Sequence, residues 1–184
     1  SKTRKAGVSR TYKGCDGFAP MAAYLGQEGW TLELEMREGS QHCQKGTPEF
    51  LGRVLARARG LTKRGLLLRL DSGNDAIDNI AVVEAHNEQH PDALPVRYII
   101  KWNPRQESRE QWLAHAEEHA EWVEPRPGKC VATFDVIVQR EDADYAYSLR
   151  RVMRVVERTI DKHGQHLLVP EAEIEGWWTS LWAD

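Results

Sequence analysis

The first clear pattern along the chain is an alternation of apolar and polar residues between positions 30 and 36. Its apolar members are Trp30, Leu32, Leu34 and Met36. This period of two predicts a strand that has one face in solvent. An apolar stretch over residues 18–25 precedes it, and the short link 26–29 begins and ends with glycine. We therefore predict a β-hairpin over residues 18–36.

Two later segments have the spacing of amphipathic helices. In the first, Thr47 can act as the N-cap, Pro48 suits the first helical position, and Gly60 marks the end. One face of this helix would carry Phe50, Leu51, Val54, Leu55 and Ala58. A second helix is predicted over residues 75–87, through Ile77, Ile80, Ala81, Val83 and Glu84.

Each of these helices is followed by an apolar strand. Residues 66–70 form a nearly continuous apolar run broken only by Arg69, which predicts a central parallel strand covered on both faces. Residues 96–102 form the next strand. The order strand, strand, helix, strand, helix, strand places residues 1–104 in the α/β class with a mixed sheet.

The pattern changes beyond Pro104. An acidic helix is predicted around residues 110–121, a breaker run follows at 125–128, and residues 131–138 form a strong strand. Residues 145–160 fit both helical spacing and alternation. We favour strands there, because β-branched and aromatic residues are frequent and a turn precedes them. Residues 167–169 and 173–178 would supply further short strands, so 105–184 is predicted as a helix plus a β-rich region.

Composition and charge narrow the classes of partner only slightly. The formal net charge of −3 over 184 residues gives no global signal for binding a polyanion. The first fourteen residues contain no acid but include the basic residues Lys2, Arg4, Lys5, Arg10 and Lys13. A second acid-free basic stretch covers residues 50–70, whereas acids gather over 107–124. This asymmetry permits a basic face for nucleic acid, although charge runs are more often solvated helix faces.

The cysteines and the hydropathy indicate in which cellular compartment the protein would function. Cys15, Cys43 and Cys130 are widely spaced and form no C-x-x-C motif, which favours reduced intracellular thiols over a zinc ribbon or a disulfide framework. No apolar run reaches the length of a membrane span, and the start lacks a signal-peptide pattern. We therefore expect a cytoplasmic protein with no membrane partner.

The segment Leu70-Asp71-Ser72-Gly73-Asn74 is the strongest candidate for chemistry. It puts a carboxylate at the end of an apolar strand and follows it with a glycine turn. In open α/β sheets, ligands bind outside the carboxyl ends of the strands, so Asp71 could hold a metal ion. The alternative is that Asp71 only caps the helical turn that follows, since aspartate is a favoured N-cap residue.

Histidine and tryptophan residues give weaker signals. His115 and His119 lie four residues apart on the predicted acidic helix, as metal ligands often do, but Ala116 stands where a zinc protease keeps its glutamate. His86 and His90 have the same spacing at a helix end. Trp178 belongs to a C-terminal tryptophan cluster. We favour a buried structural role for that cluster over stacking on a nucleobase.

Taken together, the motifs resemble the DDE transposases of bacterial insertion sequences. The matching segments span almost the whole chain: Ser1 to Thr3, Gly7 to Gly14, Asp16 to Pro20, Gly39 to Thr47, Leu70 to Asp75 and Glu175 to Thr179. The closest group has a ribonuclease H-like core that is interrupted by a β insertion. In that family a D-S-G segment carries the second metal-binding aspartate, which corresponds to Asp71 here. The resemblance therefore implies that Asp71 is a catalytic metal ligand.

The resemblance also implies that this chain carries only part of the family's site. Three carboxylates hold two Mg²⁺ or Mn²⁺ ions in such enzymes. The family's first aspartate lies on a core strand upstream of Ser1, and its glutamate lies beyond Asp184. Residues 1–104 would then be a segment of the ribonuclease H-like core and residues 105–184 would contain the β insertion. We expect an inactive middle segment of the catalytic domain.

The expected activity of the full-length protein is metal-dependent cleavage of phosphodiesters and DNA strand transfer. Its partners would be double-stranded DNA at transposon ends and targets, and a second transposase subunit. Candidate phosphate contacts are Lys2, Arg4, Lys5, Arg10 and Lys13, and Trp178 is a candidate for stacking on an unpaired base. Two alternatives stay open at this point: a non-catalytic remnant that binds DNA or a transposase subunit, and a metal-dependent nuclease of the same fold.

Overall fold

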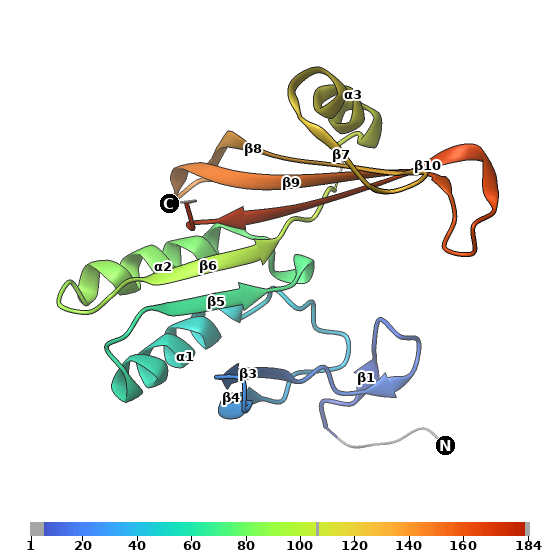
Figure 1. Cartoon of the computed structure of the whole chain (residues 1–184). Coiled ribbons are helices and arrows are strands. Elements are labelled where there is room, and N and C mark those ends of the chain that lie inside the picture. The colour runs from blue at the N-terminus through green and yellow to red at the C-terminus, as the bar shows by residue number, and fades with distance from the viewer. Residues whose placement is uncertain (1–5, 106, 183–184) are drawn as a thin grey trace. The chain divides into compact units, whose positions relative to one another are not determined.

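The computed structural model describes residues 6–105 and 107–182, which adopt a mixed α+β fold. Its elements are β1 (Ser9–Arg10), β2 (Asp16–Gly17), β3 (Met21–Leu25), β4 (Trp30–Glu35), α1 (Thr47–Leu61), β5 (Leu66–Leu70), the 3-10 turn η1 (Ser72–Asn74), α2 (Ile77–Gln89), β6 (Val96–Lys101), α3 (Arg109–His119), β7 (Trp122–Arg126), β8 (Lys129–Glu141), β9 (Ala146–Ile160) and β10 (His166–Thr179). Figure 1 shows them along the chain. None of the described helices is long and apolar enough to cross a membrane.

The chain forms two compact units, and each is described by itself. The first contains the described residues up to Leu67 together with Ala76–Val96. The second contains Leu68–Asp75 together with the described residues from Arg97 onward. The units therefore divide within β5 and at the start of β6, whereas the boundary expected from sequence lay between residues 104 and 105.

The first unit contains the predicted hairpin and the first two predicted helices, α1 and α2. β3 and β4 pair antiparallel, with Ala22 opposite Leu34 and Leu25 opposite Trp30, which confirms the hairpin. Helix α1 begins one position earlier than predicted. Gly46 is its N-cap with φ 74°, and Thr47 is a helical residue whose hydroxyl donates to the carbonyl of Cys43 at 2.7 Å.

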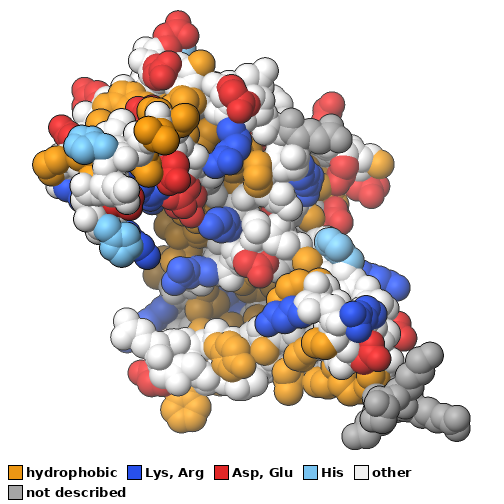
Figure 2. Space-filling view, turned by 90° about the vertical axis from the view of Figure 1, so that its right-hand side faces the viewer, with side chains coloured by type: hydrophobic (Ala, Val, Ile, Leu, Met, Phe, Trp, Pro, Cys, Tyr) orange, Lys and Arg blue, Asp and Glu red, His pale blue; other side chains and the backbone are white. Residues whose placement is uncertain are grey.

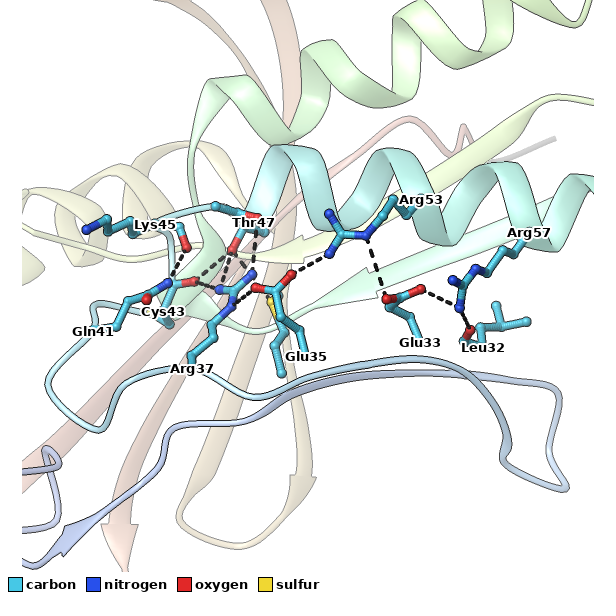
Figure 3. Close-up of polar contacts among 12 residues, drawn as sticks. Leu32, Glu33, Glu35, Arg37, Gln41, Cys43, Lys45, Thr47, Arg53 and Arg57 are labelled. Carbon is cyan, nitrogen blue, oxygen red and sulfur yellow. Dashed lines mark hydrogen bonds and ion pairs between the residues drawn. The ribbon is translucent and has the colours of Figure 1, made fainter. Parts of the chain in front are cut away.

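The hairpin packs on α1 through the charged side of β4, and the sequence pattern had left open which side of the strand is covered. Glu33 forms an ion pair with Arg57 at 2.5 Å, and Glu35 forms one with Arg53 (Figure 3). Two apolar side chains of the same strand are exposed, Trp30 by 70% and Leu34 by 58%, whereas Leu32 is half-buried. The structure therefore has one face of the strand in solvent, as predicted, and that face carries Trp30 and Leu34.

Arg37 fixes the loop that leads from the hairpin to α1. Its buried guanidinium bonds to the Glu35 carboxylate at 2.6 Å, to the Cys43 carbonyl at 2.9 Å and to the Gly46 carbonyl at 3.1 Å (Figure 3). One cation therefore neutralises a neighbouring acid and satisfies backbone acceptors of the loop before α1.

A six-stranded mixed sheet runs through the second unit in the order β5-β6-β10-β9-β8-β7. β10 is antiparallel to both β6 and β9, whereas the arrows of β5 and β6 point the same way in Figure 1. β5 is an edge strand of the described sheet, and its Leu67 is 48% exposed. The prediction of a central strand covered on both faces is therefore wrong for these residues.

The β-rich half of the chain is more continuous than predicted. β8 and β9 pair over thirteen consecutive residues of β8, from Lys129 opposite Arg158 to Glu141 opposite Ala146, with no bulge. The strand interpretation of residues 145–160 is thereby confirmed. The two short strands predicted after it belong to one strand, β10, whose pairing shifts between His166 and Glu171.

Helix α3 and strand β7 complete the second unit. Ala116 of α3 is fully buried against Ala132 of β8 and Val155 of β9, and Trp122 packs at the border of this cluster. β7 includes Pro125, which the sequence suggested as a breaker. Because β7 is an edge strand, proline can lie there without removing a hydrogen bond from the centre of the sheet.

Candidate functional site

Asp71 lies immediately after β5 and begins the turn η1. Its backbone is extended, with φ −79° and ψ 174°. Oδ1 accepts hydrogen bonds from the amide of Gly73 at 3.1 Å and from the side-chain amide of Asn74 at 2.8 Å. The capping role considered from sequence is therefore present in the structure.

Capping leaves part of this carboxylate available for a ligand. Asp71 is exposed, and within the described part of the chain no hydrogen bond or ion pair engages its Oδ2. Such an exposed carboxylate suits a hard divalent cation such as Mg²⁺ or Mn²⁺. Among residues 6–105 and 107–182, however, no group of three or more His, Cys, Asp or Glu side chains could hold a metal ion.

Asp75, at the other end of the turn, is buried and fully hydrogen-bonded. Its Oδ1 accepts from Arg140 of β8 at 2.5 Å, and its Oδ2 accepts from the backbone amide of Asn103 at 2.8 Å. Asn103 follows β6, and its side-chain amide also reaches the carbonyl of Ser72 at 3.5 Å. The loops after β5 and β6 are thus joined at the carboxyl ends of their strands, the place where ligands gather in such sheets.

Arg105 adds a second cation to this junction. It donates to the backbone carbonyl of Asp75, and its own amide donates to Asn103 Oδ1 at 3.2 Å. Its φ is 48°, a left-handed conformation that is uncommon for a residue other than glycine. The exposed Arg105 therefore places positive charge beside the Asp71 turn at some backbone cost.

Trp178 of β10 is buried, and it contacts Arg140, the arginine that binds Asp75. It is 3% exposed, and the guanidinium carbons of Arg140 and Arg151 lie 5.0 and 4.8 Å from its ring centre. An unpaired base could stack on this indole only after these arginines moved. For Trp178 the geometry matches the buried structural role that we favoured, whereas Trp182 of the same cluster is 65% exposed.

Arg151 is itself enclosed by aromatic rings. Its guanidinium carbon lies 4.8 Å from the ring centre of Trp102 and 4.6 Å from that of Trp112, in addition to Trp178. The Glu107 carboxylate accepts two bonds from Arg151, at 2.9 and 3.0 Å, and one from each of the two indoles Trp102 and Trp112. This cluster combines a bidentate ion pair with cation–π contacts.

The pKa of Glu107 reflects two opposed influences. Burial alone would raise it, because desolvation penalises the carboxylate. The hydrogen bonds and charge of Arg151, with the indole donors of Trp112 and Trp102, outweigh burial and hold the pKa below its ordinary value of 4.5. Glu107 is therefore ionised at neutral pH and balances the charge of Arg151.

The predicted phosphate contacts belong to the first unit or lie outside the described residues. Arg10 is exposed on β1 opposite Asp16, and Lys13 is exposed with its Nζ 5.8 Å from the ring centre of Tyr12. Lys2, Arg4 and Lys5 are outside the described residues. In the view of Figure 2, Lys and Arg side chains lie among Asp, Glu and hydrophobic ones.

Within each of the two histidine pairs the rings lie close together, but neither pair belongs to a group of three or more potential metal ligands among residues 6–105 and 107–182. The ring centres of His115 and His119 are 4.7 Å apart, and His115 also packs on Phe134. His86 and His90 stack at 4.2 Å. Burial and the nearby charge of His90 lower the pKa of His86, so its imidazole is neutral at pH 7.

Sequence reasoning found Asp71 but missed the residues that surround its turn. Asp75 lies next to the Asp71 motif in the sequence, but its burial and its partners are visible only in the structure. Arg140 had no detectable sequence signal, because its contact with Asp75 depends on strand pairing far along the chain. Comparison of the chain with family models, with curated proteins and with solved structures found no match.

Proposed function

We propose that this chain is the middle segment of a DDE transposase catalytic domain, with a ribonuclease H-like core and a β insertion. The observation that carries the proposal is the exposed Asp71 at the carboxyl end of β5, which keeps Oδ2 free of any partner in the described residues. It supports the role that the motif similarity implies. Asp71 would bind Mg²⁺ or Mn²⁺ together with carboxylates supplied from outside these 184 residues.

The chemistry would be phosphodiester hydrolysis followed by strand transfer. Bound divalent ions supply a stronger oxygen nucleophile and stabilise the leaving oxygen. The role of this chain would be to hold one ligand carboxylate in a fixed position at the sheet edge. The exposed Arg10 and Lys13 would contact DNA phosphates, as would Lys2, Arg4 and Lys5, and binding would weaken steeply with added salt.

The test uses the full-length gene product and a labelled DNA duplex that carries a transposon end. Replacing Asp71→Asn keeps the shape and the capping acceptor but removes the charge. We expect cleavage to fall by at least about 10³-fold, a loss typical of a group that stabilises the reacting centre, with DNA affinity within about twofold of wild type. Asp78→Asn is the matched control, because Asp78 is an exposed acid seven positions away at the start of α2.

A change of ligand chemistry makes the test more specific. Asp71→Cys should abolish cleavage in Mg²⁺ and restore part of it in Mn²⁺, because a thiolate binds the softer metal better. Full cleavage by Asp71→Asn would refute the assignment. Cleaved ends without any joined product would identify a nuclease of the same fold instead.

A second candidate is a non-catalytic remnant that binds DNA or a transposase subunit. It is favoured by the fact that no further acid joins Asp71 in a metal-binding group within the described residues. The natural coding sequence discriminates between the two. An aspartate at the end of a strand upstream and a glutamate on a helix downstream support the enzyme, and their absence supports the remnant.

A further inference from the structure

The turn that carries Asp71 is held at both ends. At its second end the contacts come from distant parts of the chain. Its first end continues directly from β5. Its second end is Asp75, whose side chain is only 3% exposed. Both carboxylate oxygens of Asp75 accept hydrogen bonds, one from Arg140 and one from the Asn103 amide. Asp75 is therefore held by β8 and by the loop that follows β6.

Arg140 donates hydrogen bonds to both the side chain and the backbone of Asp75. One guanidinium nitrogen bonds to the Asp75 carboxylate at 2.5 Å, and another reaches the Asp75 backbone carbonyl at 3.3 Å. Together these bonds fix the orientation of the main chain at the end of the turn as well as that of the side chain. A lysine in this place could supply the charge but not the fork of donors.

Arg140 is in turn held by the β-rich part of the same unit. Its guanidinium lies over the buried ring of Trp178, and its side chain is 16% exposed. Trp178 is paired with Arg151 across β10 and β9 and with Ile100 across β10 and β6. The indole therefore forms a rigid support beneath Arg140.

We propose that Trp178, Arg140 and Asp75 form a positioning relay that sets the geometry of the Asp71 carboxylate. Trp178 orients Arg140, Arg140 holds Asp75, and Asp75 fixes the end of the turn that starts at Asp71. None of the three touches a substrate in this proposal, so they are positioning residues. Any effect of these residues on catalysis depends on the proposed function. Their effect on the structure of the turn does not depend on it.

The relay acts on a metal site as an outer-shell partner does. Such partners orient the groups that contact the metal, and their loss typically lowers metal affinity by roughly 10–100-fold. A residue needed only for folding would change the amount of active protein without changing the metal concentration at half activity. Metal titration therefore separates a positioning role from a purely structural one.

The experiment compares Arg140→Met, Arg140→Lys and the control Arg158→Met in the full-length protein. Arg158 lies on β9 and forms an ion pair with Glu173, with 27% of its side chain exposed. We expect Arg140→Met to raise the half-saturating Mn²⁺ concentration for cleavage by at least about tenfold, with most of the rate recovered at saturating Mn²⁺. Arg140→Lys should lie between Arg140→Met and wild type, and Arg158→Met should match wild type.

Hydrogen exchange provides a readout that does not depend on activity. In Arg140→Met, the amides of Gly73, Asn74 and Asn103 should exchange at least about tenfold faster, because the turn is no longer tied to β8. Should Arg140→Met not fold, the neutral pair Asp75→Asn with Arg140→Met replaces it, since no buried charge is then left alone.

The outcomes separate the two levels of the proposal. Unchanged exchange in the Asp71 turn and an unchanged Mn²⁺ midpoint in Arg140→Met would overturn the relay. Faster exchange together with full cleavage by Asp71→Asn would support the relay as a tether of the turn and refute the proposed function. Faster exchange with a shifted Mn²⁺ midpoint would support both.

Discussion

Glu107 and Arg151 should respond very unequally to neutralisation, although they form one ion pair. The perturbation is Glu107→Gln in one variant and Arg151→Met in another. The Arg151 side chain is 3% exposed, whereas that of Glu107 is 43% exposed. Removing the glutamate charge therefore leaves a cation enclosed by indoles, while removing the arginine leaves a carboxylate that water can reach.

The expected magnitudes follow from this difference in exposure. Breaking a buried pair by removing one partner costs about 3–5 kcal/mol when the remaining charge cannot be solvated. The three cation–π contacts of Arg151 persist in Glu107→Gln, so we expect the lower end, about 3 kcal/mol. Methionine can fill the space between the rings in Arg151→Met, and Glu107 can be hydrated, so we expect about 1 kcal/mol. For a chain of this size, these values correspond to losses of about 6–12 °C and 2–4 °C in Tm.

The assay is urea unfolding followed by tryptophan fluorescence, since Trp102, Trp112 and Trp178 all contact Arg151. The double variant should be more stable than Glu107→Gln alone, because it removes the isolated cation. Arg158→Met gives the effect of losing an arginine from a partly exposed pair on the same sheet. The reasoning is refuted if Arg151→Met is the more destabilising single variant, or if the double variant is no more stable than Glu107→Gln.

Two further predictions concern the first unit. Arg37→Met should destabilise it by about 2–4 kcal/mol, since a buried cation with several hydrogen bonds is lost. Arg57→Met should cost less, about 1 kcal/mol, because Arg57 is itself 56% exposed and Arg53 still lies 3.6 Å from the half-buried Glu33 that it leaves behind. Equal urea midpoints for these variants would contradict this. His86 should titrate below 6.5 by NMR, and its contribution to stability should be lost as pH falls from above 6.5, because the unfolded chain then binds the proton first. A pKa of His86 at or above 6.5 would show that its burial and neighbours do not disfavour the charged form.

Local sequence patterns predicted most helices and strands because their residues satisfy both spacing and end signals. Pro48 and the apolar face of α1 are one example, and the alternation that favoured strands in β9 is another. The same patterns did not determine which face of β4 is buried. That choice depends on Arg53 and Arg57 of α1, which neutralise Glu33 and Glu35 and allow the charged face to pack inward.

The candidate site was predictable only where its residues are neighbours in sequence. Asp71 could be found because the apolar strand and the glycine turn adjoin it. Arg140 is sixty-five positions from Asp75, and their contact requires the β8–β9 hairpin to be in register with the sheet. The environment of Trp178 depends on the same pairing. A single sequence carries no local sign of such distant contacts.

The unbroken pairing of β8 with β9 limits where the length of this chain can change. Inserting or deleting one residue between Lys129 and Arg140 would turn the side chains beyond it to the opposite face of the sheet. Arg140 would then point away from Asp75. The turn at 142–145 and the irregular pairing between His166 and Glu171 do not impose this constraint on Arg140. Among homologous chains, length variation should therefore collect at these two places and avoid the first strand of the hairpin.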